Sequence, residues 1–475
     1  MTRPTQARPT VTVYVTSHDY GQYLRQCLQS VFDQSFDDWE LLVFDDGSTD
    51  GTRSIAQEFA ARAPHRVRLF VNDAPMGVRA CANVAIAEAR GTYLMRLDAD
   101  DYLDRSALLV MAHELERDRA LALVYPNWTY VNAAGDALGV ERRKKLGVET
   151  EVADIPPHGA CTMVRLRALK VVGGYDESLD AQDGHELWLK FVGRFKVASV
   201  DTPLFFYRQH GSSLSRDEER LLSARRAVKR RAAQQRNDNL RPRVAAIVPV
   251  KNTYEAVQNV ALAPVAGKPL VDYTLDAAVE SGCVDSVLVT TDDPAVVEHC
   301  LKRGDVLAEL RPPELSDPTA KLLDVLHHGV DHLEQERSVF ADVIVLLGIH
   351  TPLRTHEHIR EAVDTLLLYD HDHVISTYED YDLHFQHGAT GMEPLNPGMV
   401  NRIRYEREAL YVDNGAVHAL WRDLVQPDIR LSGRVGHIAM SRADSRQIKS
   451  NEDRIIINAV LTARRASTVD PGYRQ

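Results

Sequence analysis

The sequence predicts an α/β protein with two domains, each built on a Rossmann-like sheet of parallel strands covered by helices. Two observations support this fold class. Short apolar, β-branched runs alternate with stretches in which apolar side chains recur at the helical period. This alternation begins at Val11 and begins again at Val244, on either side of a basic stretch at 216–243. A chain of 475 residues is long enough to form two such cores.

The first domain is expected over residues 11–215, after a lead-in at 1–10. The lead-in is polar and has no apolar centre, so we expect it to be disordered and not to act as a signal peptide. Strands are expected at 11–16, 39–44, 67–71 and 91–97, and helices around 24–32, 55–59 and 78–89. In a parallel sheet with helices on both faces, ligands bind outside the carboxyl ends of the strands.

Two acidic turns follow strands of this first domain. Asp98-Ala99-Asp100-Asp101 closes one strand, and Asp45-Asp46-Gly47-Ser48-Thr49-Asp50 closes another. An unpaired carboxylate inside a sheet is very costly, so three of them in four residues indicate the end of a strand. A solvated acidic turn is the usual explanation of one such cluster, but the second turn can face the same site. Together they predict a divalent cation bound with a phosphate.

Composition excludes several other classes of protein. A net charge of −12 with 26% charged and 44% hydrophobic residues argues against a general nucleic-acid binder. Five dispersed cysteines without a CxxC pair indicate reduced thiols, mostly in the core. No apolar run approaches the roughly 18 residues that a membrane span requires. We therefore expect a cytoplasmic protein without a transmembrane segment, with peripheral attachment to the inner membrane face as the alternative.

Residues 216–243 predict a basic helical linker. The segment 221–231 could contact an anionic membrane. We favour a solvated connecting helix, because its apolar face is thin. In the second domain, residues 244–475, strands are expected at 244–249, 284–291 and 343–347, and helices at 270–281 and 359–368.

The first domain resembles the inverting glycosyltransferases of family 2, which have the GT-A fold. The resemblance implies transfer of a sugar from a nucleotide-diphosphate donor to a glycan or small-molecule acceptor, with Mn²⁺ or Mg²⁺ as cofactor, and a role in surface polysaccharide assembly. It rests on a set of motifs in this order: Ser17-His18-Asp19-Tyr20-Gly21-Gln22-Tyr23-Leu24, Asp45-Asp46-Gly47-Ser48-Thr49-Asp50, Gly77 with Asn83, Leu97-Asp98-Ala99-Asp100-Asp101, Gly173-Gly174-Tyr175-Asp176, Gln182-Asp183-Gly184-His185-Glu186-Leu187-Trp188 and Tyr207-Arg208-Gln209-His210.

The resemblance also implies roles for individual residues. Asp100 is the expected metal ligand, with Asp98 contacting the ribose or supporting the metal. His210 is a further metal or phosphate contact, or alternatively a structural histidine. Asp46 would accept a hydrogen bond from the base, which favours uracil. The residues expected to bind the donor nucleotide are Ser17, Asp19, Asp45, Asp46, Asn83 and Asp98.

Inversion requires a base that takes the proton of the acceptor hydroxyl. By the resemblance Asp183 occupies the place of this base, and its alternative role, a helix N-cap, is compatible with it. On the acceptor side we name His158 and Trp188, although Leu187-Trp188-Leu189 favours a place in the core for Trp188.

The second domain resembles the cytidylyltransferases that activate sialic acids as CMP-sugars. The supporting segments are Gly267-Lys268-Pro269-Leu270, Thr290-Thr291-Asp292-Asp293, Arg311-Pro312-Pro313-Glu314-Leu315, Thr351-Pro352-Leu353-Arg354-Thr355 and Asn414-Gly415-Ala416. Three functional segments depart from the family. The phosphate loop 251–259 has no glycine and contains Glu255, His350 interrupts a conserved segment, and Gln447-Ile448-Lys449 replaces the family's Asp-Ile-Asp.

We therefore expect this second nucleotide-sugar fold to have lost ordinary cytidylyl transfer. It would bind a partner or ligand, with Asn414 and Lys449 as ligand contacts, or mediate homo-oligomerisation, since relatives are commonly dimers. One alternative is a bifunctional enzyme that also makes a CMP-sugar, in which Lys449 replaces part of the metal's charge. Another is a non-catalytic scaffold that binds nucleotide-sugars.

Overall fold

The chain forms two compact units in the computed structural model. The first comprises Met1–Val228 with Tyr381–Glu408, and the second Lys229–Asp380 with Ala409–Gln475. The structure describes residues 8–143, 146, 156–179, 182–192, 194–210, 218–236, 241–251, 253–254, 257–258, 260–317, 319–388, 390–425 and 433–469. Most of the predicted lead-in, and Glu255 of the predicted phosphate loop, lie outside these ranges.

The first unit is built on a nine-stranded sheet with the order β3-β2-β1-β4-β8-β6-β9-β5, in which β7 also pairs with β6. Its parallel part consists of β1 (Val11–Ser17), β2 (Trp39–Asp46), β3 (Val67–Asn72) and β4 (Tyr93–Asp98). These four strands confirm the prediction. The other strands are β5 (Tyr102–Leu103), β6 (Leu121–Val131), β7 (Ala137–Glu141), β8 (Met163–Arg165) and β9 (Lys196–Arg208).

The parallel strands predicted up to residue 97 form one part of this sheet, and strands that the sequence analysis did not predict form the rest. Strand β8 runs antiparallel to both β4 and β6, and β5 runs antiparallel to β9. The sequence analysis followed the alternation of apolar strands and helices only to residue 97, so it made no prediction for these later strands.

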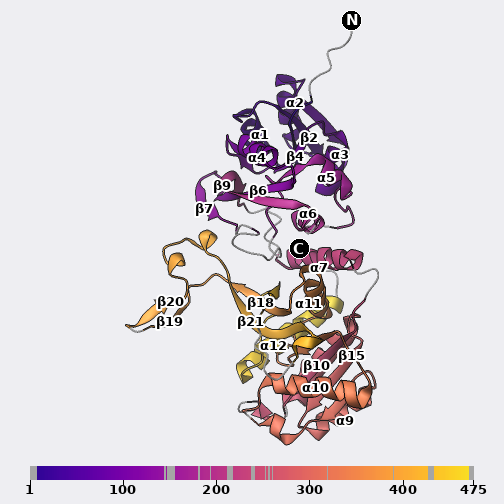
Figure 1. Cartoon of the computed structure of the whole chain (residues 1–475). Helices are drawn as coiled ribbons and strands as arrows, with labels where there is room; N and C mark the ends of the chain where they lie inside the picture. The colour runs from indigo at the N-terminus through magenta and orange to yellow at the C-terminus, as the bar shows by residue number, and fades with distance from the viewer. Residues whose placement is uncertain are drawn as a thin grey trace. The chain divides into compact units, whose positions relative to one another are not determined.

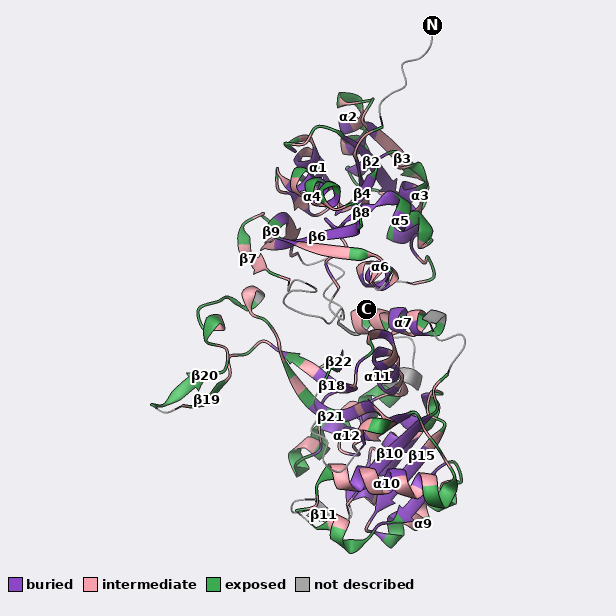
Figure 2. Ribbon diagram, viewed as in Figure 1, coloured by how far each residue is buried: buried purple, intermediate pink, exposed green. Residues whose placement is uncertain are grey.

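Helices cover both faces of the first sheet. They are α1 (Gly21–Phe32), α2 (Thr52–Arg62), α3 (Val78–Glu88), α4 (Ala107–Arg117), α5 (Leu166–Val171) and α6 (Asp183–Phe191). Val13 packs in a cluster with residues of α1, α2 and α4, whereas Tyr14 packs in one with residues of α3, α5 and α6. Because successive strand residues are buried on opposite faces, the central strands read as continuous apolar runs. Figure 2 shows β2 and β4 largely in the colour of buried residues.

The segment Tyr381–Glu408 belongs to the first unit, although the sequence placed it within the second domain. It contains β19 (Phe385–His387), β20 (Met392–Pro394), η4 (Pro397–Met399) and η5 (Arg404–Glu406). Helix η5 packs against β7, where Gly139 leaves room for the side chains of Ile403 and Glu406. This contact is between residues far apart in sequence, which local patterns do not reveal.

A basic helix forms where the linker was expected, as α7 (Glu218–Arg236). Lys229 of α7 is buried and donates hydrogen bonds to Glu361 Oε1 (3.0 Å) and Thr365 Oγ1 (3.1 Å) of α11 (His356–Tyr369). The Lys229 side chain is therefore directed at protein, while the choice between a connecting helix and a membrane contact for 221–231 stays a prediction.

The second unit is built on a seven-stranded sheet with the order β16-β15-β10-β17-β21-β18-β22. Figure 1 labels β10, β15, β18 and β21 of this sheet. Strands β10 (Val244–Val250), β15 (Ser286–Thr291), β16 (Leu307–Leu310) and β17 (Val343–Leu347) run parallel, and β21 (Leu410–Trp421) is antiparallel to β17 and to β18 (His373–Asp380). Strand β22 (Val435–Ala439) closes the edge, parallel to β18. Short elements are β11 (Thr253–Tyr254), β12 (Val257–Gln258), η2 (Val260–Leu262), β13 (Pro264–Val265), β14 (Lys268–Pro269), η3 (Pro313–Ser316) and η6 (Arg422–Leu424).

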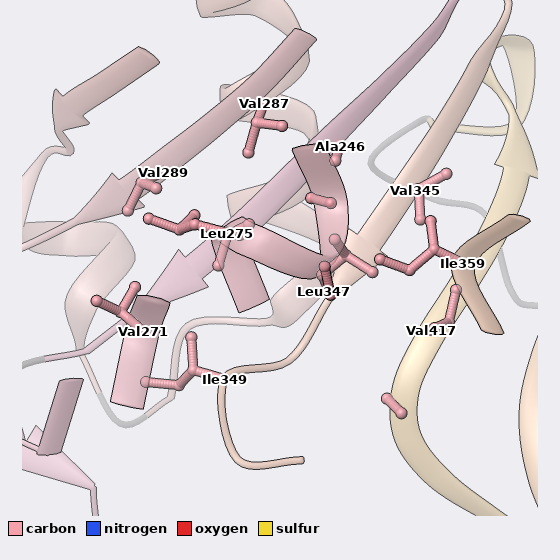
Figure 3. Packing of buried hydrophobic residues seen from close by; sticks show 14 of the residues in the cluster. Ala246, Val271, Leu275, Val287, Val289, Val345, Leu347, Ile349, Ile359 and Val417 are labelled. Atoms are coloured by element: carbon pink, nitrogen blue, oxygen red, sulfur yellow. The ribbon is translucent and has the colours of Figure 1, made fainter. Parts of the chain in front are cut away.

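The helices of the second unit also lie on both faces of its sheet. On one face, Val271 and Leu275 of α8 (Leu270–Glu280) pack with strand residues such as Val289 and Leu347 (Figure 3). On the other face, α10 (Leu322–Arg337) covers β10 and β15. The remaining helices are α9 (Pro294–Arg303) and α12 (Asn451–Val469). The predicted strands and helices of this domain are therefore present.

Four of the five cysteines are buried, and all five are free thiols. Within the described part of the chain, no helix has both the length and the apolar character needed to cross a membrane.

The buried Lys229–Glu361 ion pair should fasten α7 to the second unit. We expect Lys229→Met to destabilise this unit by about 3–5 kcal/mol, because it leaves the Glu361 carboxylate buried without its cation. Urea unfolding followed by hydrogen exchange of peptides from α11 measures the effect. Replacing both partners, in Lys229→Met/Glu361→Leu, should recover most of the loss. The matched control is Lys302→Met in the exposed Lys302–Glu298 pair, which should change nothing measurable.

Candidate active site

The two acidic turns of the first unit lie at one edge of its sheet. Ser17 of β1 pairs with Asp45 of β2, and Thr16 pairs with Asp98 of β4. Because β2 and β4 flank β1 in parallel register, their carboxyl ends meet at the same edge. This arrangement is the one that the sequence predicted.

Asp46 is buried and holds the loop that enters α3. Its Oδ1 accepts hydrogen bonds from Asn72 Nδ2 and from the N–H of Met76, both at 2.8 Å, and its Oδ2 accepts one from the N–H of Gly77 at 2.8 Å. Burial alone would raise the pKa of Asp46, but these donated hydrogen bonds outweigh it and hold the pKa below its ordinary value. With both oxygens engaged and the residue only 2% exposed, the predicted direct contact with a base is not available in this structure.

The neighbouring residues of this edge are also engaged in the loops. The Asp45 carboxylate accepts from Arg53 Nε (2.7 Å) and from the N–H of Ser48 (3.1 Å). Asp19, at φ +57°, accepts from the N–H of Thr49 at 2.7 Å and ties the loop after β1 to the turn after β2. Ser17 is fully buried at the end of β1. These residues build the wall of the site, and Asp19 remains partly exposed there.

Asn83 was expected to bind the donor nucleotide, but its side chain clamps the turn before α6. Its Oδ1 accepts from the N–H of Tyr175 (2.9 Å), and its Nδ2 donates to Tyr175 O (2.9 Å) and to Glu177 Oε1 (2.8 Å). Both ends of the amide are used in this way, so the structure gives Asn83 a positioning role in place of the predicted ligand contact.

Asp100 and His210 meet at the end of β4. His210 Nε2 lies 2.9 Å from Asp100 Oδ2, and the imidazole is buried against the rings of Tyr20 and Tyr23. Burial and the charge of Asp98 raise the pKa of Asp100, and His210 partly offsets the rise. In the described ranges no group of three or more His, Cys, Asp or Glu side chains is arranged to hold a metal ion.

Asp101 is the most enclosed carboxylate of the turn. Its Oδ1 accepts from the N–H of Arg208 at 2.8 Å, and its Oδ2 is buried without a hydrogen-bond partner. Burial, together with the charges of Asp100 and Asp98, raises its pKa well above the ordinary value. Arg208 also donates to the main-chain oxygen of Asp100 at 2.8 Å, so this arginine, to which the sequence analysis gave no role of its own, shapes the acidic turn.

Arg96 joins the predicted donor side to the predicted base. It donates to both carboxylate oxygens of Asp98, from Nε at 2.6 Å and from Nη2 at 3.1 Å, while its Nη1 forms an ion pair with Asp183 Oδ2. Sequence reasoning missed Arg96. The available signal was a cation two residues before Asp98, and so on the same face of an otherwise apolar strand.

Two contacts bring Asp183 to this place. The backbone of Gly184 approaches that of Gly159 so closely that a Cβ on Gly184 would lie 3.0 Å from Gly159 Cα. Further along α6, Glu186 forms a buried ion pair with Arg79 of α3 and accepts from the N–H of Asp176 at 2.8 Å. The N-terminus of α6 is therefore fixed from both sides.

The two residues named on the acceptor side have different surroundings. His158 lies among Trp128, Phe205 and Tyr207, with ring centroids 4.4–5.5 Å away, and burial lowers its pKa to about 4. Its imidazole is therefore neutral at physiological pH. Trp188 is only 2% exposed and packs edge-on against Tyr125, so stacking on an acceptor sugar is excluded in this structure.

In the second unit, the two predicted ligand residues differ in their exposure to solvent. Asn414 is buried and fully hydrogen-bonded, accepting from Ser376 Oγ (2.6 Å) and donating to Ser445 Oγ (2.8 Å). In this structure its side chain holds neighbouring segments of the fold together, and the expected ligand contact stays a prediction. Lys449 is exposed, and the preceding residue, Ile448, donates its N–H to His350 O at 2.8 Å. Two of the three altered segments therefore lie side by side.

We expect Asp46 to stabilise the first unit by an amount that depends on pH. Asp46→Asn places an NH₂ group against buried N–H donors whichever way the amide is turned, so we expect a loss of about 1–3 kcal/mol at neutral pH. Because the folded-state pKa is lowered, the wild-type advantage should persist above the ordinary carboxyl pKa and vanish as the pH falls through the lowered value. Denaturant unfolding of both proteins from neutral to acidic pH measures this, with the exposed Asp73→Asn as control. An advantage that does not change with pH would contradict the expectation.

Each half of the chain matches a different protein family. Residues 12–163 match the family described as "Glycosyl transferase family 2", and residues 245–421 match the family described as "Cytidylyltransferase". Asp183 and His210 lie beyond the first of these matches.

Known proteins are similar to one half of the chain at a time. Chondroitin synthase of Escherichia coli is 32% identical over 196 residues, which cover 40% of this chain and 27% of that protein. N-acylneuraminate cytidylyltransferase of Streptococcus agalactiae is 34% identical over 135 residues, covering 28% of this chain and 31% of that protein. Among solved structures, TarS residues 1–349 of S. aureus in complex with UDP-GlcNAc aligns with a TM-score of 0.42 and 18% identity, covering 49% of this chain and 68% of that one. The chain thus spans about a third or less of these two curated relatives, and it joins a region that matches the glycosyltransferase family 2 model to a region that matches the cytidylyltransferase model.

Proposed function

We propose that the first unit transfers a sugar from a nucleotide-diphosphate donor to an acceptor hydroxyl with inversion. The observation that carries this proposal is the placement of Asp183 in the same site as Asp98, joined through Arg96. A base candidate beside the carboxylates of the donor side is the arrangement that single-displacement transfer requires.

In the proposed reaction Asp183 accepts the proton of the attacking hydroxyl. Its carboxylate is 22% exposed and stands at the first residue of α6, so solvent and an acceptor can reach it. His158 borders the same side and stays neutral, so it would orient an acceptor by hydrogen bonding and not by charge.

Asp100 and His210 would hold the divalent cation. A carboxylate oxygen and an imidazole nitrogen that already face each other at 2.9 Å suit Mn²⁺ or Mg²⁺, whose remaining ligands would be diphosphate oxygens and water. When bound, the cation neutralises the charge that develops on the leaving diphosphate.

For the donor we propose a UDP-sugar, with the base lying against the loops that Asp46 and Asp19 hold. Asp46 would act through the main chain of the loop at Met76 and Gly77, since its own oxygens are engaged. For the acceptor we propose a glycan, because the relatives of the first unit include proteins named chondroitin synthase and hyaluronan synthase.

The second unit would serve in ligand binding or homo-oligomerisation. Lys449 is exposed where relatives carry a metal carboxylate, and it stands beside the altered segment around His350. The second candidate function is synthesis of a CMP-sugar by this unit, which its likeness to N-acylneuraminate cytidylyltransferase favours.

A donor screen tests the proposed transfer. We expect a UDP-sugar to raise the unfolding temperature in the presence of Mn²⁺ and less in its absence, because Asp100 and His210 supply only two ligands. Transfer of labelled sugar to glycan fragments then measures activity. Asp183→Asn should lower kcat by about 10²–10⁴-fold while keeping the Mn²⁺-dependent stabilisation.

Matched variants separate the roles within that experiment. Asp100→Asn should remove the dependence of donor stabilisation on Mn²⁺, and the exposed Asp33→Asn should behave as the wild type. Stabilisation without any turnover would favour a non-catalytic scaffold, and no stabilisation by any donor would contradict the proposal.

The second unit should not release pyrophosphate from CTP. We expect no turnover when the full chain is incubated with CTP, Mg²⁺ and a nonulosonate, because Lys449 cannot ligate a metal while protonated. A coupled pyrophosphate assay, with a functional N-acylneuraminate cytidylyltransferase as positive control, measures it. Robust turnover would establish the bifunctional alternative.

A further inference from the structure

One side chain connects the two halves of the candidate active site. Arg96 stands on β4 with its guanidinium between Asp98, which ends the same strand, and Asp183, which begins α6. The three side chains are 14%, 26% and 22% exposed. They therefore form a half-buried carboxylate–guanidinium–carboxylate array that opens to solvent.

The shape of the guanidinium explains why an arginine occupies this position. Its Nε and Nη2 form a two-pronged contact with Asp98, and Nη1 remains for Asp183. A lysine carries one compact charge and cannot make the planar contact to one carboxylate while bonding another. Arg96 thus offers separate nitrogen atoms to its two carboxylate partners.

Arg96 differs in this from the other buried arginine that holds α6. Arg79 pairs with Glu186 and donates to Asp176 O at 3.0 Å, which fastens α6 to α3 and to the turn before it. These contacts of Arg79 are with α6 and with the turn before it. Arg96 instead acts on the residue that the proposed chemistry uses.

We propose that Arg96 is a positioning residue that sets Asp183 against the donor side of the site, so that the base is aligned only when Asp98 is in place. This assignment rests on the proposed glycosyl transfer and deepens it. Arg96 takes no proton and touches no reacting atom in the proposed step. Its contribution is the orientation of the carboxylate that receives the proton of the acceptor hydroxyl.

The kinetics of Arg96 variants test the assignment. We expect Arg96→Ala to lower kcat by about 100-fold with a much smaller change in the KM for the donor, because misplacing a catalytic group by about 1 Å has an effect of that size. Added guanidinium, at concentrations far below those that unfold the protein, should recover most of the lost kcat. Arg96→Lys should remain well below the wild type, since it keeps the charge but lacks the fork.

Two further variants separate positioning from support of the fold. Arg79→Ala removes a buried arginine from the same helix, and we expect a lower unfolding temperature without rescue of kcat by guanidinium. Arg96→Ala/Asp183→Asn should be no slower than Asp183→Asn alone, because Arg96 acts through that carboxylate.

The outcomes are distinguishable from failure of the proposed function. If the wild type transfers sugar and Arg96→Ala keeps the wild-type kcat, the positioning role is wrong while the proposed transfer stands. The same holds if Arg96→Ala lowers kcat, added guanidinium does not restore it, and its effect adds to that of Asp183→Asn. If the wild type transfers no sugar from any donor, the proposed function falls and the role of Arg96 falls with it.

Discussion

The crowding of carboxylates at the end of β4 is the constraint on which the first unit depends. Asp98, Asp100 and Asp101 stand within four residues, and each repels the others in a partly buried setting. Each carboxylate has its own compensation: the Arg96 guanidinium for Asp98, the His210 imidazole for Asp100, and the Arg208 N–H for Asp101. The compensating groups come from β4 itself, from the end of β9 and from the residues just after it, so the acidic turn depends on contacts between distant parts of the chain.

The second unit has a buried cation near the corresponding edge of its sheet, where the first unit has clustered carboxylates. In the second unit the buried Arg354 lies beside the end of β17. Its Nη1 donates to the main-chain oxygens of Gly348 and Ala416, both at 3.0 Å. Burial lowers the pKa of Arg354 to about 9. A related layout thus carries clustered carboxylates in one unit and a buried cation in the other, and this contrast, more than the fold, separates the chemistry proposed for each.

Sequence reasoning recovered the parts of the molecule that local patterns encode. The parallel strands and their helices follow from continuous apolar runs and helical periodicity, and the meeting of Asp45 with Asp98 at one edge follows from parallel topology. It did not recover the partners of each side chain. Asp46 and Asn83 have donor and acceptor groups suited to a nucleotide, yet they satisfy loop N–H groups, because a buried main-chain donor must also be paired.

The base candidate shows why these long-range partners matter for function. Asp183 begins α6, and nothing in its own sequence fixes the distance to β4. That distance is set by the Gly159–Gly184 approach, by the Glu186–Arg79 pair and by Arg96, which come from three separate parts of the chain. A substitution at any of them would displace the carboxylate without altering the acidic motif. The motif is therefore necessary for the proposed chemistry, but the packing of α6 decides whether the residues of the motif and the base work as one site.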